Sequence, residues 1–287
     1  MKIHQTLNQA VQLLINKGIT SANLDAEILL AYVLKTSREI IIAHPEKQLT
    51  KQQIKKFQSL ILRRSHYEPI AYLVGYKFFY GLKIKVSPQV LIPRLETEQL
   101  VDLVRSYLEE NNFNHQVITI LDIGTGSGAI SLALKKYLPL YKIYGLELSA
   151  EAIKLAKNNS QNLHLKIIFK KSNLLSDFTG DLKNTIIVAN LPYLDKNQLK
   201  DLPPEIKKGL YYEPATALFA GRHGLACYQQ LFNQISSHQN HPQAIFIEIN
   251  NIFWQDFLAL SKKYFPQQKI NVIKDIFRQP RFIKIIF

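Results

Sequence analysis

Cysteine is nearly absent from this chain of 287 residues, which contains only Cys227. A single cysteine excludes an internal disulfide framework and is typical of a reducing compartment. Long apolar runs are also absent: no stretch approaches the roughly 20 apolar residues of a membrane-spanning helix, and the first residues lack the apolar core of a signal peptide. The 8 histidines are scattered without the spacing of a metal site. We therefore expect a cytoplasmic protein with neither a membrane span nor a bound metal.

Acidic residues are fewer than basic ones. The chain has 22 Asp and Glu against 36 Lys and Arg, a formal net charge of +14. This charge favours an anionic partner, either a nucleic acid or an acidic protein surface, but it sets encounter rates and not chemistry. Residues 262–284 carry seven Lys or Arg against Asp275. Lysines that protect the edge of a sheet explain much of that excess without any partner.

A helical pattern occupies the start of the chain. Apolar residues recur at helical spacing up to Gly18, and two further helices are expected over residues 25–34 and 52–64. The length of the chain suits one large domain plus a small one. The sequence therefore predicts an N-terminal helical domain over residues 1–73.

Residues 74–93 follow a different pattern. Leu82, Ile84 and Val86 alternate with two lysines, which is the period of a half-exposed strand, and Gly81 precedes them. A strand pattern on each side of a glycine predicts a β-hairpin. We expect this hairpin to link the helical domain to the rest of the chain.

Strand-like and helix-like segments alternate through the rest of the chain, which predicts a parallel sheet with helices on both faces. Only residues 278–281 separate the last two strands, so these two must form an antiparallel hairpin. The predicted fold class is α/β, with a seven-stranded Rossmann-like sheet, an antiparallel last strand and a small N-terminal helical domain. The expected strands are residues 117–122, 142–147, 165–169, 185–189, 243–249, 270–276 and 281–287, and the expected helices are residues 96–109, 129–138, 150–159, 224–236 and 253–264.

A glycine-rich turn, Asp122-Ile-Gly124-Thr-Gly126-Ser-Gly128, follows the first expected strand of this sheet. Glycines let the backbone turn sharply and let a ligand approach closely. Glu147 stands about 20 residues further on, at the end of the next strand, where a carboxylate can bind both ribose hydroxyls of a nucleoside cofactor. The spacing G-x-G-x-G differs from the dinucleotide fingerprint, and no P-loop Lys-Ser/Thr pair follows. A nucleoside site is therefore favoured over triphosphate chemistry.

The tetrapeptide Asn190-Leu191-Pro192-Tyr193 follows the apolar run of residues 185–189, at the edge of the sheet where ligands bind. The amide oxygen of Asn190 and a neighbouring carbonyl can accept both N–H donors of a planar –NH2 group, on which Tyr193 can stack. Such a nitrogen is a weak nucleophile and needs a reactive electrophile placed in line. Taken alone, a β-turn explains the tetrapeptide equally well.

With both motifs in this order, the chain resembles the class I S-adenosylmethionine-dependent methyltransferases, whose sheet has seven strands with the last antiparallel. Residues 190–193 resemble the Asn-Pro-Pro-Tyr motif of those that act on amide or exocyclic nitrogens. Residues 63–75, 91–98 and 213–225 are similar to segments of the HemK-type protein-(glutamine-N5) methyltransferases, known as release factor glutamine methyltransferases. The resemblance spans nearly the whole chain, including Leu24-Asp-Ala-Glu27 in the helical domain.

The resemblance implies methyl transfer from S-adenosyl-L-methionine, with S-adenosyl-L-homocysteine as product, to the side-chain amide N5 of the Gln in the GGQ motif of class I peptide chain release factors. It divides the chain into a substrate-recognition domain (1–73), a hairpin linker (74–93) and a methyltransferase domain (94–287). We expect a monomer that requires no nucleic acid. The implied catalytic residues are Asn190, Pro192 and Tyr193; the substrate-binding residues are Asn190, Leu191, Pro192 and Tyr193; the cofactor-binding residues are Gly124, Thr125, Gly126, Ser127, Gly128, Glu147, Asn173, Leu174 and Asn190.

Four residues depart from the family pattern, and one of them, Glu147, is only one methylene longer than the commoner Asp, which we expect to be tolerated. Leu191 replaces the first Pro of the motif, so its N–H needs a partner, and the variant also resembles the motif of rRNA adenine dimethyltransferases. Asn173 stands where the family usually has Asp, and Leu95 replaces a Pro. Three alternatives therefore stay open: glutamine-N5 methylation of a ribosomal protein, adenine-N6 methylation of RNA or DNA, and a cofactor-binding protein without catalysis.

Overall fold

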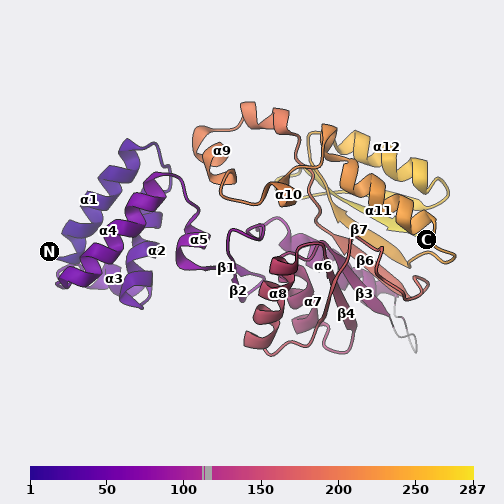
Figure 1. The fold of residues 1–287 in the computed structure, drawn as a ribbon, viewed down its shortest axis with the longest axis horizontal. Coiled ribbons are helices and arrows are strands. Elements are labelled where there is room, and N and C mark those ends of the chain that lie inside the picture. The colour runs from indigo at the N-terminus through magenta and orange to yellow at the C-terminus, as the bar shows by residue number, and fades with distance from the viewer. Residues whose placement is uncertain (112, 114–117) are drawn as a thin grey trace. The chain divides into compact units, whose positions relative to one another are not determined.

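The computed structural model describes residues 1–111, 113 and 118–287, so residue 117 of the first expected sheet strand lies outside the described residues. The chain forms two compact units (Figure 1). One comprises Met1–Tyr76 with Asp201–Tyr212, and the other comprises Lys77–Lys200 with Glu213–Phe287. The expected domain boundaries stay a prediction. The helical unit differs from them because it takes in a segment that is distant in sequence.

The three N-terminal helices that apolar periodicity predicts are present as α1 (Ile3–Asn16), α2 (Ala22–Leu34) and α4 (Lys51–Ser65). The start of α4 has a reciprocal cap, since Thr50 Oγ1 accepts the N–H of Gln53 while the Gln53 side chain accepts the N–H of Thr50. Periodicity missed two helices of 6 and 5 residues, which are too short to show it. These are α3 (Arg38–Ala43) and α5 (Ile70–Val74).

The segment Asp201–Tyr212 joins the helical unit through Glu205, in α9 (Pro204–Leu210). One carboxylate oxygen of Glu205 accepts from both the N–H and the hydroxyl of Thr20, and the other lies 2.5 Å from Arg64 Nη2. Arg64 is buried and also pairs with Asp25 at 2.7 Å. Removal of one partner from a buried ion pair is strongly destabilising, so this network fixes the segment to the helices.

The predicted hairpin is confirmed as β1 (Tyr76–Phe79) and β2 (Leu82–Lys85), and Leu82 and Ile84 are buried while the intervening lysines are exposed. The predicted fold class is also confirmed. The sheet has seven strands in the order β5-β4-β3-β6-β7-β9-β8, and β9 runs in the direction opposite to the other six, antiparallel to both β7 and β8. The strands are β3 (Thr119–Ile123), β4 (Lys142–Glu147), β5 (Ile168–Lys171), β6 (Thr185–Ala189), β7 (Ala244–Glu248), β8 (Lys269–Lys274) and β9 (Pro280–Ile286).

Helices cover both faces of this sheet, with α6, α7 and α8 on one side and α11 and α12 on the other (Figure 1). All five were predicted within a few residues of their bounds. The remaining short helices of this unit, η1, α10 and η2, were not. The bounds are α6 (Glu98–Asn111), α7 (Ala129–Tyr137), α8 (Ala150–Asn162), η1 (Lys196–Lys200), α10 (Ala215–Leu218), η2 (Arg222–Gly224), α11 (Ala226–Ser236) and α12 (Trp254–Tyr264).

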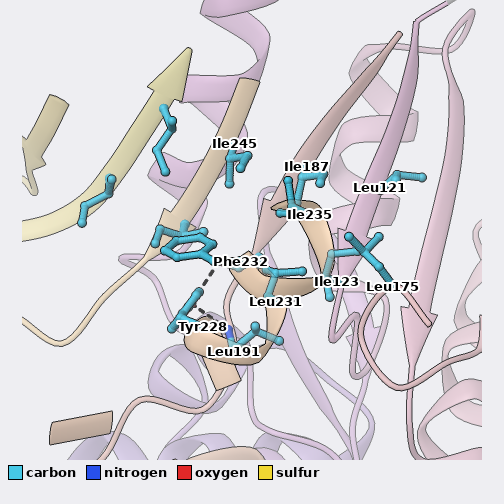
Figure 2. Packing of buried hydrophobic residues seen from close by; sticks show 14 of the residues in the cluster. Leu121, Ile123, Leu175, Ile187, Leu191, Tyr228, Leu231, Phe232, Ile235 and Ile245 are labelled. Carbon is cyan, nitrogen blue, oxygen red and sulfur yellow. Dashed lines mark hydrogen bonds between the residues drawn. The ribbon is translucent and has the colours of Figure 1, made fainter. Parts of the chain in front are cut away.

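A large hydrophobic cluster lies between the sheet and α11 and α12. Every residue of β6 and β7 is buried, as expected for central strands covered on both faces. Figure 2 shows Leu231 and Ile235 of α11 among strand residues such as Ile187 and Ile245. The same cluster extends to Leu191, just beyond β6. The core therefore fixes the strand ends that carry the predicted site.

Candidate functional site

A cavity of about 640 Å³ opens at the carboxyl ends of β3, β4 and β6, a size typical of small-molecule sites. It brings together most of the residues predicted from the two motifs. The lining does not include Gly128 or Tyr193, both of which are described. The predicted residues in the lining are Gly124, Thr125, Gly126, Ser127, Glu147, Asn173, Leu174, Asn190, Leu191 and Pro192.

Glycine is required at two points of the turn after β3. Gly124 has φ +72°, and a Cβ there would lie 2.7 Å from Leu191 Cδ2. Gly128 has φ +82° and is the N-cap residue of α7, where an added Cβ would meet three side-chain atoms at 3.3 Å. Residues other than glycine rarely adopt this left-handed backbone conformation. The turn thus keeps its backbone close to the cavity and to the residue-190 loop.

Asp122, in β3, stabilises the glycine turn through hydrogen bonds to its side-chain carboxylate. Its Oδ2 accepts from the Thr125 hydroxyl at 2.6 Å, and from the N–H and hydroxyl of Ser131 at 3.1 and 2.6 Å. Its Oδ1 is buried without a hydrogen-bond partner among the described residues. Burial raises the pKa of Asp122 to about 6. Asp122 does not line the cavity, so it acts on the site by holding the backbone of the turn through Thr125 and Ser131. Sequence reasoning had used Asp122 only as the start of the motif.

Glu147 ends β4 and lies beside the turn. Its Oε2 accepts the N–H of Gly126 at 3.0 Å, and its Oε1 accepts the N–H of Ser149 at 2.9 Å. Each carboxylate oxygen has a second lone pair, so both can still accept a ligand hydroxyl. These contacts orient the carboxylate at the cavity wall, where it was predicted to bind ribose.

The amide of Asn190 is held in one orientation. Its Nδ2 donates to Thr97 Oγ1 and to Glu248 Oε2, each at 3.0 Å. A carboxylate is an acceptor only, so the nitrogen must be the atom that faces it. The Asn190 oxygen takes no part in these bonds. It remains the acceptor that this side chain offers to a ligand.

The neighbouring N–H of Leu191, which the family motif lacks, has a partner. It donates to the hydroxyl of the buried Tyr228 at 3.0 Å (Figure 2). That hydroxyl in turn donates to the backbone oxygen of Glu248 at 2.6 Å. Leu191 itself is 4% exposed and packs over Gly124. The Leu191 substitution is thus compensated locally by one hydroxyl on α11.

Tyr193 also bonds to Glu248. Its hydroxyl donates to Glu248 Oε1 at 2.8 Å, and burial together with that nearby carboxylate raises the pKa of Tyr193 well above its ordinary value. Its backbone oxygen would lie 1.9 Å from a Cβ on Gly224, which has φ +73°. Only glycine fits there. Glycine at this position explains part of the resemblance over residues 213–225.

Two family-like segments meet through Glu213. Its Oε2 accepts the N–H of Ile92 at 3.0 Å, and its Oε1 accepts from Arg94 Nη2 at 2.5 Å. Glu213 is 7% exposed. This clamp fixes the segment that carries Arg94 and Thr97 into the cavity wall. Sequence reasoning missed the contacts of Thr97, Glu213 and Glu248, because each joins segments far apart in the chain.

The chemistry of the lining fits a nucleoside-type cofactor. No group of three or more His, Cys, Asp or Glu side chains that could hold a metal ion occurs among the described residues. Over the same part of the chain, no helix is long and apolar enough to span a membrane. What the cavity offers is backbone N–H groups, a carboxylate at Glu147 and an oriented amide at Asn190.

Comparisons with known proteins agree with this geometry. A family model described as the PrmC N-terminal domain matches residues 5–75, and one described as the methyltransferase small domain matches residues 99–206. A release factor glutamine methyltransferase of Bacillus cereus is 32% identical over 285 residues, covering 99% of this chain and 98% of that protein. Another, of Buchnera aphidicola subsp. Schizaphis graminum, is 38% identical over 249 residues, 86% of each. The N-terminal domain of human METTL16 in complex with SAH shares the fold, with TM-score 0.53 and 13% identity over 90% of this chain and 94% of that one.

Proposed function

This chain belongs to the family of release factor glutamine methyltransferases, and we propose that it methylates the side-chain amide N5 of the Gln in the GGQ motif of class I peptide chain release factors. The family indicated by the sequence motifs is thereby confirmed. The observation that carries the proposal is the amide of Asn190, which is fixed at the cavity with its oxygen as the remaining acceptor.

The methyl donor is S-adenosyl-L-methionine, which supplies an electrophilic methyl group on a sulfonium and leaves as S-adenosyl-L-homocysteine. The cavity of about 640 Å³ suits a ligand of this size. We assign ribose binding to Glu147, the methionine part to the glycine turn, and the adenine to Asn173 and Leu174. The full cofactor set is Gly124, Thr125, Gly126, Ser127, Gly128, Glu147, Asn173, Leu174 and Asn190.

The target amide is held by two acceptors, the side-chain oxygen of Asn190 and the carbonyl oxygen of Leu191. Together they accept both N–H groups of the glutamine and aim its nitrogen lone pair away from themselves. Pro192 stiffens the loop, and Tyr193 supports it through Glu248. Because an amide nitrogen is a poor nucleophile, placement and exclusion of water do most of the work. The nitrogen–carbon bond forms as the methyl–sulfur bond breaks, and one amide proton leaves during or after the attack, so no strong general base is needed.

The remaining assignments complete the proposal. The N-terminal helical domain recognises the release factor, and the protein acts as a monomer in the cytoplasm without a nucleic acid. The net charge of +14 and the Leu191 variant favour one competing function, adenine-N6 methylation of RNA or DNA. Adenine presents a planar –NH2 group that the same two acceptors would bind.

The proposal is tested by incubating the protein with labelled S-adenosylmethionine and three substrates. These are a purified class I release factor, the same factor with Gln→Ala in its GGQ motif, and total RNA. Label on the intact factor alone supports the proposal. Label on RNA alone would move the protein to adenine methylation. Cofactor binding without label on any substrate would favour a non-catalytic protein.

A further inference from the structure

Glu248, the last residue of β7, accepts three hydrogen bonds at the target-amide site and was not among the predicted residues. Its Oε2 accepts from the Thr97 hydroxyl at 2.7 Å and from Asn190 Nδ2 at 3.0 Å. Its Oε1 accepts from the Tyr193 hydroxyl at 2.8 Å. The carboxylate thus joins the loop after β6 to the segment before α6.

The burial of Glu248 is costly. It is 1% exposed, and a buried carboxylate without compensation is strongly unfavourable. Its compensation comes from three hydrogen-bond donors, and none of the ion pairs found among the described residues includes it. Burial raises the pKa of Glu248, while the bonds from Thr97 and Tyr193 oppose that rise. A purely structural position would be filled at lower cost by an apolar side chain of similar volume.

The orientation of Asn190 decides which group the site can bind. With its NH2 turned toward Glu248, the Asn190 oxygen is left for the –NH2 of a glutamine substrate. If the Asn190 amide were rotated by 180°, its NH2 group would face the NH2 group of the substrate glutamine. Two hydrogen-bond donors would then face each other, and the substrate amide would be repelled. An ionised carboxylate cannot donate, so it admits only the first orientation.

We propose that Glu248 is a positioning residue that, with Thr97, locks the Asn190 amide so that the site accepts an –NH2 group and rejects a carboxylate. The inference rests on the proposed function, because it takes the target to be a glutamine amide. It makes Glu248 a determinant of selectivity for Gln over Glu, although Glu248 lies outside the cavity lining.

The test uses Glu248→Gln and Thr97→Val in the full-length protein, with Thr97→Ser as the conservative control that keeps the hydroxyl. A Gln at 248 brings a donor next to two hydroxyls and Asn190, so the lock loosens. We expect kcat on the release factor to fall about 30-fold, while the Kd for S-adenosylmethionine, measured by calorimetry, changes less than about threefold. Thr97→Val should lose about fivefold in kcat and Thr97→Ser should recover most of it.

A second readout separates positioning from general damage. The release factor with Gln→Glu in its GGQ motif serves as a competitor, and its binding is compared with that of the Gln form. Wild type should bind the Gln form much more tightly than the Glu form. The ratio of the two affinities should fall by about 10-fold in Glu248→Gln and by about threefold in Thr97→Val. Thr97→Val leaves the charge of Glu248 in place. If residue 248 acted through its charge alone, the affinity ratio of Thr97→Val would therefore equal that of wild type.

The outcomes separate a failure of the positioning role of Glu248 from a failure of the proposed methylation. Suppose that wild type methylates the release factor and that Glu248→Gln has the same kcat and the same preference for the Gln form over the Glu form as wild type. That result would overturn the positioning role. An equal loss of binding for the Gln and Glu forms would assign Glu248 to the fold alone and overturn it too. Absence of transfer by wild type to any release factor would refute the proposed function, and the inference with it.

Discussion

Removal of one hydroxyl, by Tyr228→Phe, should destabilise the protein through the loop that carries Leu191. Tyr228 is fully buried, and its hydroxyl accepts from the Leu191 N–H at 3.0 Å and donates to the backbone oxygen of Glu248 at 2.6 Å. Phenylalanine leaves both backbone groups buried without this partner, at about 1–3 kcal/mol for each. We expect the free energy of unfolding to fall by about 3 kcal/mol.

Part of the destabilisation by Tyr228→Phe comes from the unpaired N–H of Leu191. The variant Leu191→Pro isolates this part, because proline has no N–H to leave unpaired. Tyr228→Phe should therefore cost about 1–2 kcal/mol less in the Leu191→Pro background than in wild type. Urea unfolding of the four proteins measures this coupling, provided that their m-values agree. Tyr107→Phe is the control, since Tyr107 is also buried but bonds to Gln243, and its cost should not change. An equal cost of Tyr228→Phe in both backgrounds would refute the reasoning.

Four further predictions concern the turn and the loop. Asn190→Ala should abolish methyl transfer while the Kd for S-adenosylmethionine, measured by calorimetry, rises less than about threefold; persistent transfer would show that Asn190 does not hold the target amide. Glu147→Ala should raise that Kd by about 10- to 100-fold, because two charge-assisted hydrogen bonds are lost; a Kd like that of wild type would contradict ribose binding there. Gly224→Ala should lower the melting temperature and kcat together, because its Cβ would lie 1.9 Å from the Tyr193 oxygen; a fully active variant would contradict this packing. Burial raises the folded-state pKa of Asp122 from 3.8 to about 6, so the folded state binds this proton more tightly than the unfolded state. Without cofactor, the stability of wild type relative to Asp122→Asn should therefore increase by up to about 3 kcal/mol as the pH falls from about 7 to about 4; a constant difference across that range would contradict it.

Local pattern was sufficient for most of the fold. The alternation around Leu82 predicts the hairpin, and the short 278–281 connection predicts an antiparallel pair, because both depend on neighbouring residues alone. The segment Asp201–Tyr212 was not predicted to join the N-terminal helices. Its attachment depends on Glu205 meeting Arg64, a pair separated by 141 positions, and no local signal records such a contact.

The candidate site divides in the same way. The glycine turn and residues 190–193 follow predicted strands, so their meeting at one edge of the sheet could be predicted. The partners that orient them could not, since Thr97 and Glu248 reach Asn190 across 93 and 58 positions. One signal was available: Glu248 stands near the end of the expected strand 243–249, at the same edge as Asn190.

The most direct test of the central claim is to locate the methyl group by tandem mass spectrometry of a class I release factor treated with this protein and S-adenosylmethionine. Fragment ions should place one added methyl group on the side-chain amide nitrogen of the Gln in the GGQ motif, and treatment with Asn190→Ala should leave that peptide unmodified. A methyl group on another residue of the factor, or an unmodified GGQ peptide after treatment with wild type, would contradict the account.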